Sequence, residues 1–121
     1  MSYSKNQTIL IVDDEPLNIA VVAEILEERY HLLVATNGEK ALQIVFSDIK
    51  PDLILLDIIM PGMNGFEVAE KIKENTESSN IPIIFLTAKY DSESIVKGLG
   101  LGAVDYLSKP FQKEELLVRI K

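Results

Sequence analysis

Two short apolar runs in this chain each stop at a carboxylate. Leu53-Ile54-Leu55-Leu56 is followed by Asp57, and Thr8-Ile9-Leu10-Ile11-Val12 is followed by Asp13-Asp14-Glu15. Both runs are far too short to cross a membrane, and neither alternates between apolar and polar positions. This pattern is typical of strands that are covered by helices on both faces. The two runs therefore predict central strands of a parallel sheet.

The remaining segments alternate between expected strands and expected helices. Strands are predicted at 32–35, which is short and expected at an edge, at 81–86, which ends on Thr87, and at 104–108, which ends on Lys109. Between them, apolar residues recur at helical spacing. The stripes are formed by Ile19, Val22, Ala23 and Leu26, by Ala41, Leu42 and Val45, and by Phe66, Ala69 and Ile72, with further helices opening at Asp91 and at Gln112.

Local signals support the expected helix starts. Pro16 suits the first turn of the first helix, and Asn37 is a plausible N-cap for the second. Asn64 and Glu67 have the spacing of a capping box at the start of the third. Five strand–helix alternations predict an α/β fold with a doubly wound, five-stranded parallel sheet. Its expected strand order is 2-1-3-4-5, numbered along the chain.

Composition narrows the class of protein. The chain has 121 residues, 47% of them hydrophobic, which predicts one domain spanning residues 1–121. Its formal net charge of −7 argues against nucleic acid or an anionic membrane as a direct partner. It contains no cysteine and no apolar signal region, so we expect a soluble protein of the cytoplasm.

The predicted strand order gathers five polar side chains at one edge of the sheet. Asp13, Asp14 and Asp57 would lie side by side at the switch point between the first and third strands, with Thr87 and Lys109 arriving from the fourth and fifth. Three carboxylates repel one another unless a cation joins them, and oxygen ligands favour Mg²⁺. A carboxylate neutralised in this way can attack phosphorus, with Lys109 and Thr87 interacting with the phosphoryl oxygens.

Each of these residues also has an ordinary structural interpretation. Asp57 could be a solvated turn residue, Asp13 and Asp14 could cap the first helix, and Lys109 could be a surface charge. Five such residues, each at the carboxyl end of one of four predicted strands, make the functional interpretation the better one.

The same residues resemble those of a known family. Asp13-Asp14, Asp57 followed by Met60-Pro61-Gly62-Met63-Asn64-Gly65, Thr87-Ala88, and 102–111 (Gly-Ala-Val-Asp-Tyr-Leu-Ser-Lys-Pro-Phe) are similar to the receiver domain of two-component response regulators, the chemotaxis-regulator-like fold. The resemblance runs from about Thr8 to the end of the chain. It implies a flavodoxin-like, three-layer sandwich.

The resemblance also implies a role for each site residue. Asp57 would accept a phosphoryl group from a histidine kinase or a phosphotransfer protein. Asp14 would ligate Mg²⁺ directly, Asp13 mostly through water, and Ile59 through its backbone carbonyl. Thr87 and Lys109 match the two phosphate-sensing positions, and Tyr106 matches the switch aromatic.

The resemblance implies a signalling switch that turns over no external substrate and catalyses only its own phosphorylation and dephosphorylation. Phosphorylation would change the surface formed by the helix that opens at Asp91, the strand at 104–108 and the last helix. That last helix is shorter than usual in the family, so we expect an output domain beyond Lys121 or a separate effector protein. A phosphorylation-dependent homodimer stays open as an alternative.

Two other functions are compatible with the residues alone. The first is a Mg²⁺-dependent phosphatase with an aspartyl-phosphate intermediate, but such enzymes usually carry two acids spaced by one residue after one strand, and usually a cap domain. The second is a degenerate receiver that only binds proteins. Loss of one of the five residues would favour it, and none is lost.

Overall fold

The computed structural model describes residues 7–87, 105–108, 116–117 and 120. Within these residues the chain forms a parallel sheet of five strands in the order β2-β1-β3-β4-β5. The strands are β1 (Thr8–Val12), β2 (His31–Ala35), β3 (Leu53–Asp57), β4 (Ile83–Thr87) and β5 (Asp105–Ser108), and the helices are α1 (Pro16–Leu26), α2 (Gly38–Val45) and α3 (Gly65–Glu74). This confirms the predicted fold class and strand order.

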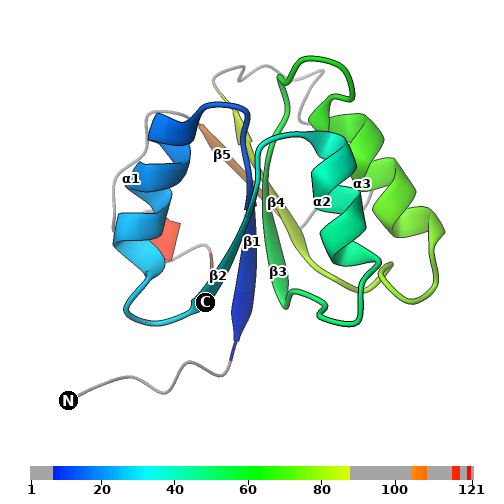
Figure 1. Ribbon diagram of the computed structural model, residues 1–121, viewed down its shortest axis with the longest axis horizontal. Coiled ribbons are helices and arrows are strands. Elements are labelled where there is room, and N and C mark those ends of the chain that lie inside the picture. Colours follow the sequence, from blue (N-terminus) through cyan, green and yellow to red (C-terminus); the bar gives the residue numbers. More distant parts are fainter. Residues whose placement is uncertain (1–6, 88–104, 109–115, 118–119, 121) are drawn as a thin grey trace.

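Helices cover both faces of the sheet (Figure 1), with α1 on one side and α2 and α3 on the other. The alternation of side chains along each strand divides the core into two clusters. Leu10, Leu56 and Phe85 belong to the cluster beneath α2 and α3. Ile11 and Leu55 belong to the cluster beneath α1, which also contains Leu116. Helices cover both faces of the sheet, and every residue of the central strand β3 is therefore buried. This confirms what its unbroken apolar run predicted.

Caps fix the helix starts that position the site. Asn37 accepts a hydrogen bond from the backbone N–H of Lys40 (2.7 Å) at the start of α2. At the start of α3, Asn64 and Glu67 form the predicted capping box, with hydrogen bonds of 3.0 and 3.1 Å. These contacts satisfy backbone donors that a helix start leaves free.

The segment between α3 and β4 is held by two polar side chains. The buried hydroxyl of Ser78 donates to the carbonyl of Ile72 (2.7 Å), which lies in the last turns of α3. The ammonium group of Lys73 donates to the carbonyls of Ser79 and Ile81 at 2.9 and 2.8 Å, and burial lowers the pKa of Lys73. Both contacts hold the loop that leads into β4.

Two predicted strand bounds were wrong by one or two residues. We expected a strand at 81–86, but β4 begins at Ile83, because the backbone N–H of Ile81 still bonds to Ser78 in the preceding turn. His31 was expected before its strand, but its N–H donates to Gln7 (2.9 Å) and so extends β2. The helix that opens at Asp91 lies outside the described residues, as does most of the last helix, of which Leu116, Leu117 and Ile120 are helical.

Candidate functional site

Three carboxylates meet at the carboxyl ends of β1 and β3. The two strands are neighbours, and Val12 is paired with Leu56, so Asp13 and Asp57 follow directly at the same edge of the sheet. One carboxylate oxygen from each of Asp13, Asp14 and Asp57 can be chosen so that all lie within 4.8 Å of one another. The structure therefore brings together the three acids that the sequence placed at this crevice.

The three acids differ in their surroundings. Asp13 and Asp57 are buried, with 3% and 6% of their surface exposed, whereas Asp14 is half-buried. One carboxylate oxygen of Asp13 accepts a hydrogen bond from the backbone N–H of Glu15 (3.0 Å). Glu15 is the N-cap residue of α1 and makes no side-chain cap. Asp13 thus orders the turn between β1 and α1 but does not cap the helix, which the structural interpretation had expected, and its carboxylate also contributes to the cluster.

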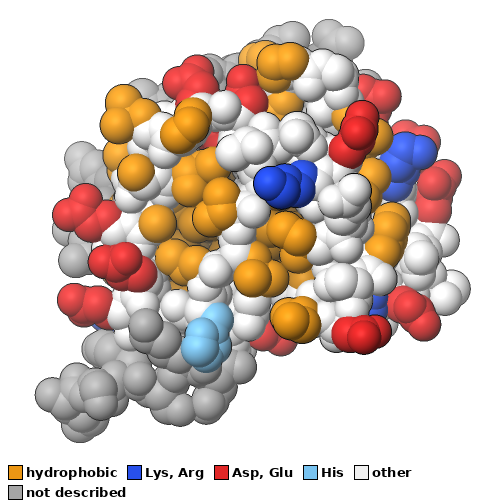
Figure 2. Space-filling model, in the orientation of Figure 1, with side chains coloured by type: hydrophobic (Ala, Val, Ile, Leu, Met, Phe, Trp, Pro, Cys, Tyr) orange, Lys and Arg blue, Asp and Glu red, His pale blue; other side chains and the backbone are white. Residues whose placement is uncertain are grey.

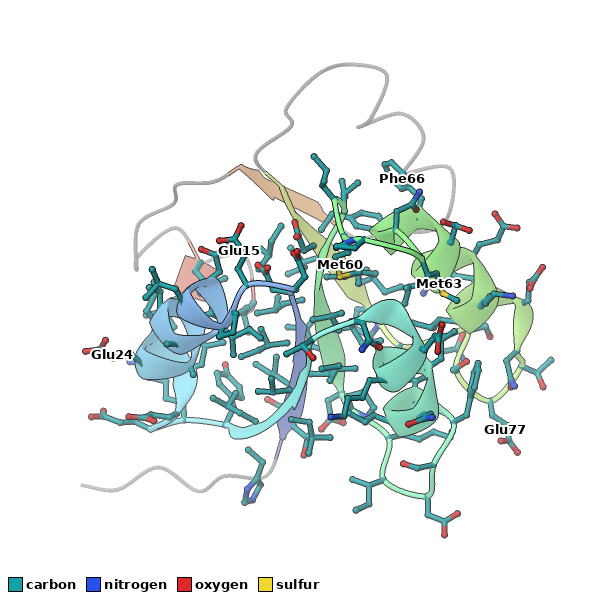
Figure 3. The ribbon with its side chains drawn as sticks, turned by 45° about the horizontal axis from the view of Figure 1, so that its top comes forward. Glu15, Glu24, Met60, Met63, Phe66 and Glu77 are labelled. Atoms are coloured by element: carbon teal, nitrogen blue, oxygen red, sulfur yellow. The ribbon has the colours of Figure 1, made fainter. Side chains whose placement is uncertain are left out.

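An open hollow of about 510 Å³ lies beside the cluster. The described residues that line it come from the β1–α1 turn, the first turn of α1, the end of β3 and the loop that follows: Asp14, Glu15, Asn18, Asp57, Ile59, Met60 and Pro61. Asp57 and Asp14 therefore face a space that a small molecule or a partner's side chain can enter. Figure 3 shows Glu15 and Met60 at this end of the molecule.

The loop between β3 and α3 is tightly built. Gly62 has a φ of 76°, which favours glycine. The backbone N–H of Gly65 donates to the carbonyl of Ile58 (2.8 Å), and a Cβ atom on Gly65 would overlap the carbonyl oxygen of Asp57. The start of α3 therefore rests directly on the end of β3, which fixes the backbone that carries Asp57.

Aromatic and sulfur-containing side chains pack around the loop between β3 and α3. The rings of Phe66 and Phe85 meet edge to face, with centroids 5.3 Å apart. Met60 is buried, and half-buried Met63 packs near Gly38 at the start of α2. Figure 3 shows Met63 between α2 and α3, and Phe66 on α3. This packing links the loop after Asp57 to both helices of that face.

For the other predicted site residues, the structure describes the backbone of Thr87 and Tyr106 only. Thr87 ends β4, one residue beyond Leu86, which pairs with Asp57, so its backbone reaches the same edge of the sheet. Tyr106 lies in β5 and pairs with Phe85. The side chains of Thr87 and Tyr106, and all of Lys109, lie outside the described part of the chain. Their predicted roles therefore stay predictions.

Sequence reasoning missed three residues that line the hollow. Asn18, in the first turn of α1, lies four residues after Asp14 and lines the same space, a spacing that could have been noticed. Met60 and Pro61 were quoted only as part of a motif, although they line the hollow beside Asp57. The side chain of Ile59 is 58% exposed at this edge.

Comparison with known proteins identifies the family. Residues 9–121 match the model of the response regulator receiver domain, so this chain belongs to that family. A probable cyclic di-GMP phosphodiesterase of Vibrio cholerae serotype O1 is 48% identical over 103 residues, which are 85% of this chain and 23% of that protein. The phosphate regulon transcriptional regulatory protein PhoB of Pseudomonas aeruginosa is 44% identical over 116 residues, 95% of this chain and 50% of PhoB.

Solved structures agree with this assignment. The Vibrio cholerae chemotaxis protein CheY4 superposes with a TM-score of 0.89 at 30% identity, covering 94% of this chain and 95% of CheY4. The Mn²⁺-bound form of the response regulator Rcp1 superposes with a TM-score of 0.82 at 26% identity, covering 94% of this chain and 88% of Rcp1. A receiver of this family is therefore known with a divalent metal, and the acidic cluster here can bind one.

Family membership argues against the phosphatase among the functions that the residues left open. The chain is a receiver domain of two-component signalling, a phosphorylation-dependent switch rather than a turnover enzyme, and a receiver implies a kinase partner. The chain spans half or less of the length of the two curated relatives described above. None of the described helices is long and apolar enough to cross a membrane.

Proposed function

We propose that Asp57 is the phosphoacceptor, and that a histidine kinase or a phosphotransfer protein supplies the phosphoryl group. The observation that carries the proposal is the meeting of three carboxylates beside an open hollow at the carboxyl ends of β1 and β3. Asp57 is the member of this cluster that both ends a buried central strand and lines the hollow. A nucleophile needs this combination of a fixed backbone and an accessible carboxylate.

The surroundings of Asp13 and Asp14 favour other roles for them. An oxygen of Asp13 is already engaged by the N–H of Glu15, and Asp13 is not among the residues that line the hollow. Asp14 lines the hollow but stands on a turn rather than on a strand. We therefore assign Asp14 as the direct metal ligand and Asp13 as a ligand that acts mostly through water.

The donor set fits Mg²⁺. Asp13, Asp14 and Asp57 offer only hard carboxylate oxygens, and the cluster contains no nitrogen or sulfur ligand. The backbone carbonyl of Ile59, two residues beyond Asp57, would complete the protein ligands. When bound, the ion would neutralise the carboxylates and the charge that develops on the phosphoryl oxygens.

The transfer itself exchanges one bond to phosphorus for another. An oxygen of Asp57 bonds to phosphorus while the phosphorus–nitrogen bond to the donor histidine breaks. The electron pair of that bond stays on the imidazole, which takes a proton from solvent. Lys109 and Thr87 would interact with the phosphoryl oxygens from the ends of the fifth and fourth strands.

The names of two relatives suggest what this receiver controls. PhoB is a transcriptional regulatory protein, and the Vibrio relative is a probable cyclic di-GMP phosphodiesterase, so we propose that this receiver controls an output domain or a separate effector in the cytoplasm. Residues 1–121 would act as one receiver domain. Movement of Thr87 toward the phosphoryl group, with Tyr106 following, would change the surface formed by the helix expected to open at Asp91, β5 and the last helix. Phosphorylation could be read out by a partner or by a homodimer.

Intact-mass measurement after incubation with acetyl phosphate tests the proposal. We expect one phosphoryl group per chain in the presence of Mg²⁺ and none after chelation of the metal. Asp57→Asn should abolish labelling. Asp48→Asn is a matched control, because Asp48 is exposed and lies away from the cluster.

Two outcomes would contradict the proposal. Undiminished labelling of Asp57→Asn would move the phosphoacceptor to another residue. Failure of the folded wild-type chain to label with Mg²⁺ would favour a receiver that acts only as a binding module.

A further inference from the structure

The edge of the sheet formed by β2 carries apolar side chains that the described residues cover only in part. β2 is the last strand on its side of the sheet. Figure 2 shows hydrophobic side chains gathered in the middle of the face on which β2 lies, between α1 and α2, with the histidine at its lower end. Val34 is 41% exposed, and its neighbours Leu32 and Leu33 are half-buried. These side chains lie on a strand whose outer edge no other described strand covers.

The hydrogen bonds to β1 show which backbone groups point outward. The N–H of His31 donates to Gln7, and the carbonyl of Ala35 accepts from Asp13. The N–H and C=O of one strand residue point to the same side, and successive residues alternate. His31, Leu33 and Ala35 therefore bond toward β1, whereas the N–H and C=O groups of Leu32 and Val34 point away from the sheet.

This edge lacks the features that usually prevent strand pairing. Such features include a shortened strand, a bulge, a proline and a lysine or other charge on the edge. β2 has five residues, as many as the central strands β1, β3 and β4, and the register with β1 is unbroken. The strand sequence His-Leu-Leu-Val-Ala contains neither proline nor an acidic or basic residue other than its first histidine. As far as the described residues go, the edge is therefore open to another strand.

We propose that a second copy of this chain pairs antiparallel with β2 about a two-fold axis at Leu33. In this register Leu32 lies opposite Val34 of the second copy, and Val34 lies opposite its Leu32. Both are residues whose backbone groups point outward, so each pair exchanges two hydrogen bonds. The five strands of each copy would then form one continuous sheet.

The side chains of β2 favour a second copy of this chain as the partner that pairs with this edge. In this register, Leu32 and Val34 are cross-strand neighbours on one face, and Leu33 meets Leu33 on the other, so apolar pairs form on both faces. His31 lies opposite Ala35, and no carboxylate of β2 faces another. A two-fold axis satisfies the edges of both copies at once, which a single extended peptide would do for one copy only.

The size of the contact and the charge of the chain determine how strongly we expect the two copies to associate. Pairing through one short strand falls below the roughly 1,200 Å² that a stable interface usually buries, so we expect a weak dimer. Each copy has a formal net charge of −7, and the repulsion between copies should weaken as salt is added. The candidate site stays open, because pairing runs along β2 and not across the ends of β1 and β3.

Sedimentation of the unphosphorylated chain tests the association. Between about 10 μM and about 1 mM, the range in which an interface of this size is expected to form, the average mass should rise from 13.5 kDa toward twice that value. The rise should be larger at about 0.5 M salt than at about 0.02 M, where charges are little screened. A chain that stays monomeric throughout overturns the proposal.

Amide hydrogen exchange tests the register on the wild-type chain. At low concentration the amides of Leu32 and Val34 should exchange much faster than that of Leu33, and at high concentration they should become protected. A dimer that leaves these two amides unprotected would use another surface, and the proposal would be wrong.

Two matched variants complete the test. Val34→Lys places a charge on the proposed contact and should weaken association at least about tenfold. Ile49→Lys places the same charge on a side chain that is 67% exposed and lies outside β2, and it should change association only slightly. Equal effects of the two variants would overturn the assignment to β2. Circular dichroism of each variant verifies folding, and the exchange experiment decides the question if either fails to fold.

Discussion

Replacing Gly65 with alanine tests how closely α3 is joined to the strand that carries Asp57. A Cβ atom at this position would overlap the carbonyl oxygen of Asp57. It would also lie 2.7 Å from the Cα atom of Ile58 and 3.0 Å from the carbonyl carbon of Asp57. All three are backbone atoms of β3 and its end, so no flexible side chain can move aside. Either α3 or the end of β3 must shift.

The expected cost follows from this geometry. Overpacking a tight contact usually costs about 1–3 kcal/mol, and a contact made only with backbone should fall at the upper end, about 3 kcal/mol. Alanine returns up to about 1 kcal/mol through its better helix propensity. We therefore expect Gly65→Ala to lose about 2 kcal/mol of unfolding free energy, which lowers the melting temperature by roughly 8 °C.

Urea unfolding with a matched glycine measures this cost. Gly62→Ala has no heavy atom within 4 Å of the new Cβ, and its cost comes only from the φ of 76°. That strain is about 1–2 kcal/mol for a residue other than glycine, partly offset by the reduced entropy of the unfolded chain. Gly65→Ala should therefore be the less stable of the two variants, and its labelling by acetyl phosphate should be slower because the backbone of Asp57 is displaced.

Two results would refute this reasoning. One is Gly65→Ala within about 0.5 kcal/mol of wild type, which is the range of a neutral surface substitution. The other is destabilisation without any change in labelling rate, which would show that the contact supports the fold but does not position Asp57.

Three further predictions concern other described contacts. Ser78→Ala should lose about 1–2 kcal/mol of unfolding free energy, because it removes the buried donor to the carbonyl of Ile72. Asp14→Ala should weaken Mg²⁺ binding, measured by isothermal titration, more than Asp13→Ala does, since Asp13 already accepts from a backbone N–H. Burial lowers the pKa of Lys73 below 10.5, so the unfolded chain binds more protons between the lowered value and 10.5. The unfolding free energy of wild type should therefore rise relative to Lys73→Gln as the pH is raised through that window.

Each of these predictions has a control or a contrary result. Ser79→Ala is the control for Ser78, because its hydroxyl is only half-buried and its hydrogen bond is long, 3.4 Å. A larger loss of Mg²⁺ affinity in Asp13→Ala would reverse the roles of the two acids. A stability difference between wild type and Lys73→Gln that falls with rising pH would show that the ammonium group is stabilised, not penalised, in the fold.

The sequence by itself predicted the strands and the helix starts, because these depend on residues that are close together in the chain. The apolar runs ending at Val12 and Leu56 predicted two buried strands, because only a strand covered on both faces needs apolar side chains at every position. Asn37 and the pair Asn64–Glu67 predicted helix starts, since a cap acts within three or four residues of the chain. With right-handed crossovers and short connections, these elements admitted few topologies, so the strand order could also be predicted.

The features that depend on distances between strands and helices could be determined only from the tertiary structure. Asp13 and Asp57 are 44 positions apart, and only the register between β1 and β3 brings their carboxylates into one cluster with Asp14. The hydrogen bond that distinguishes Asp13 from Asp14 and the contact of Gly65 with Asp57 are likewise absent from any sequence pattern. Spacing along the chain predicts which edge of the sheet a side chain reaches. The hydrogen bonds, burial and neighbours it finds there depend on how the strands and helices pack, because those contacts join residues that are far apart in sequence.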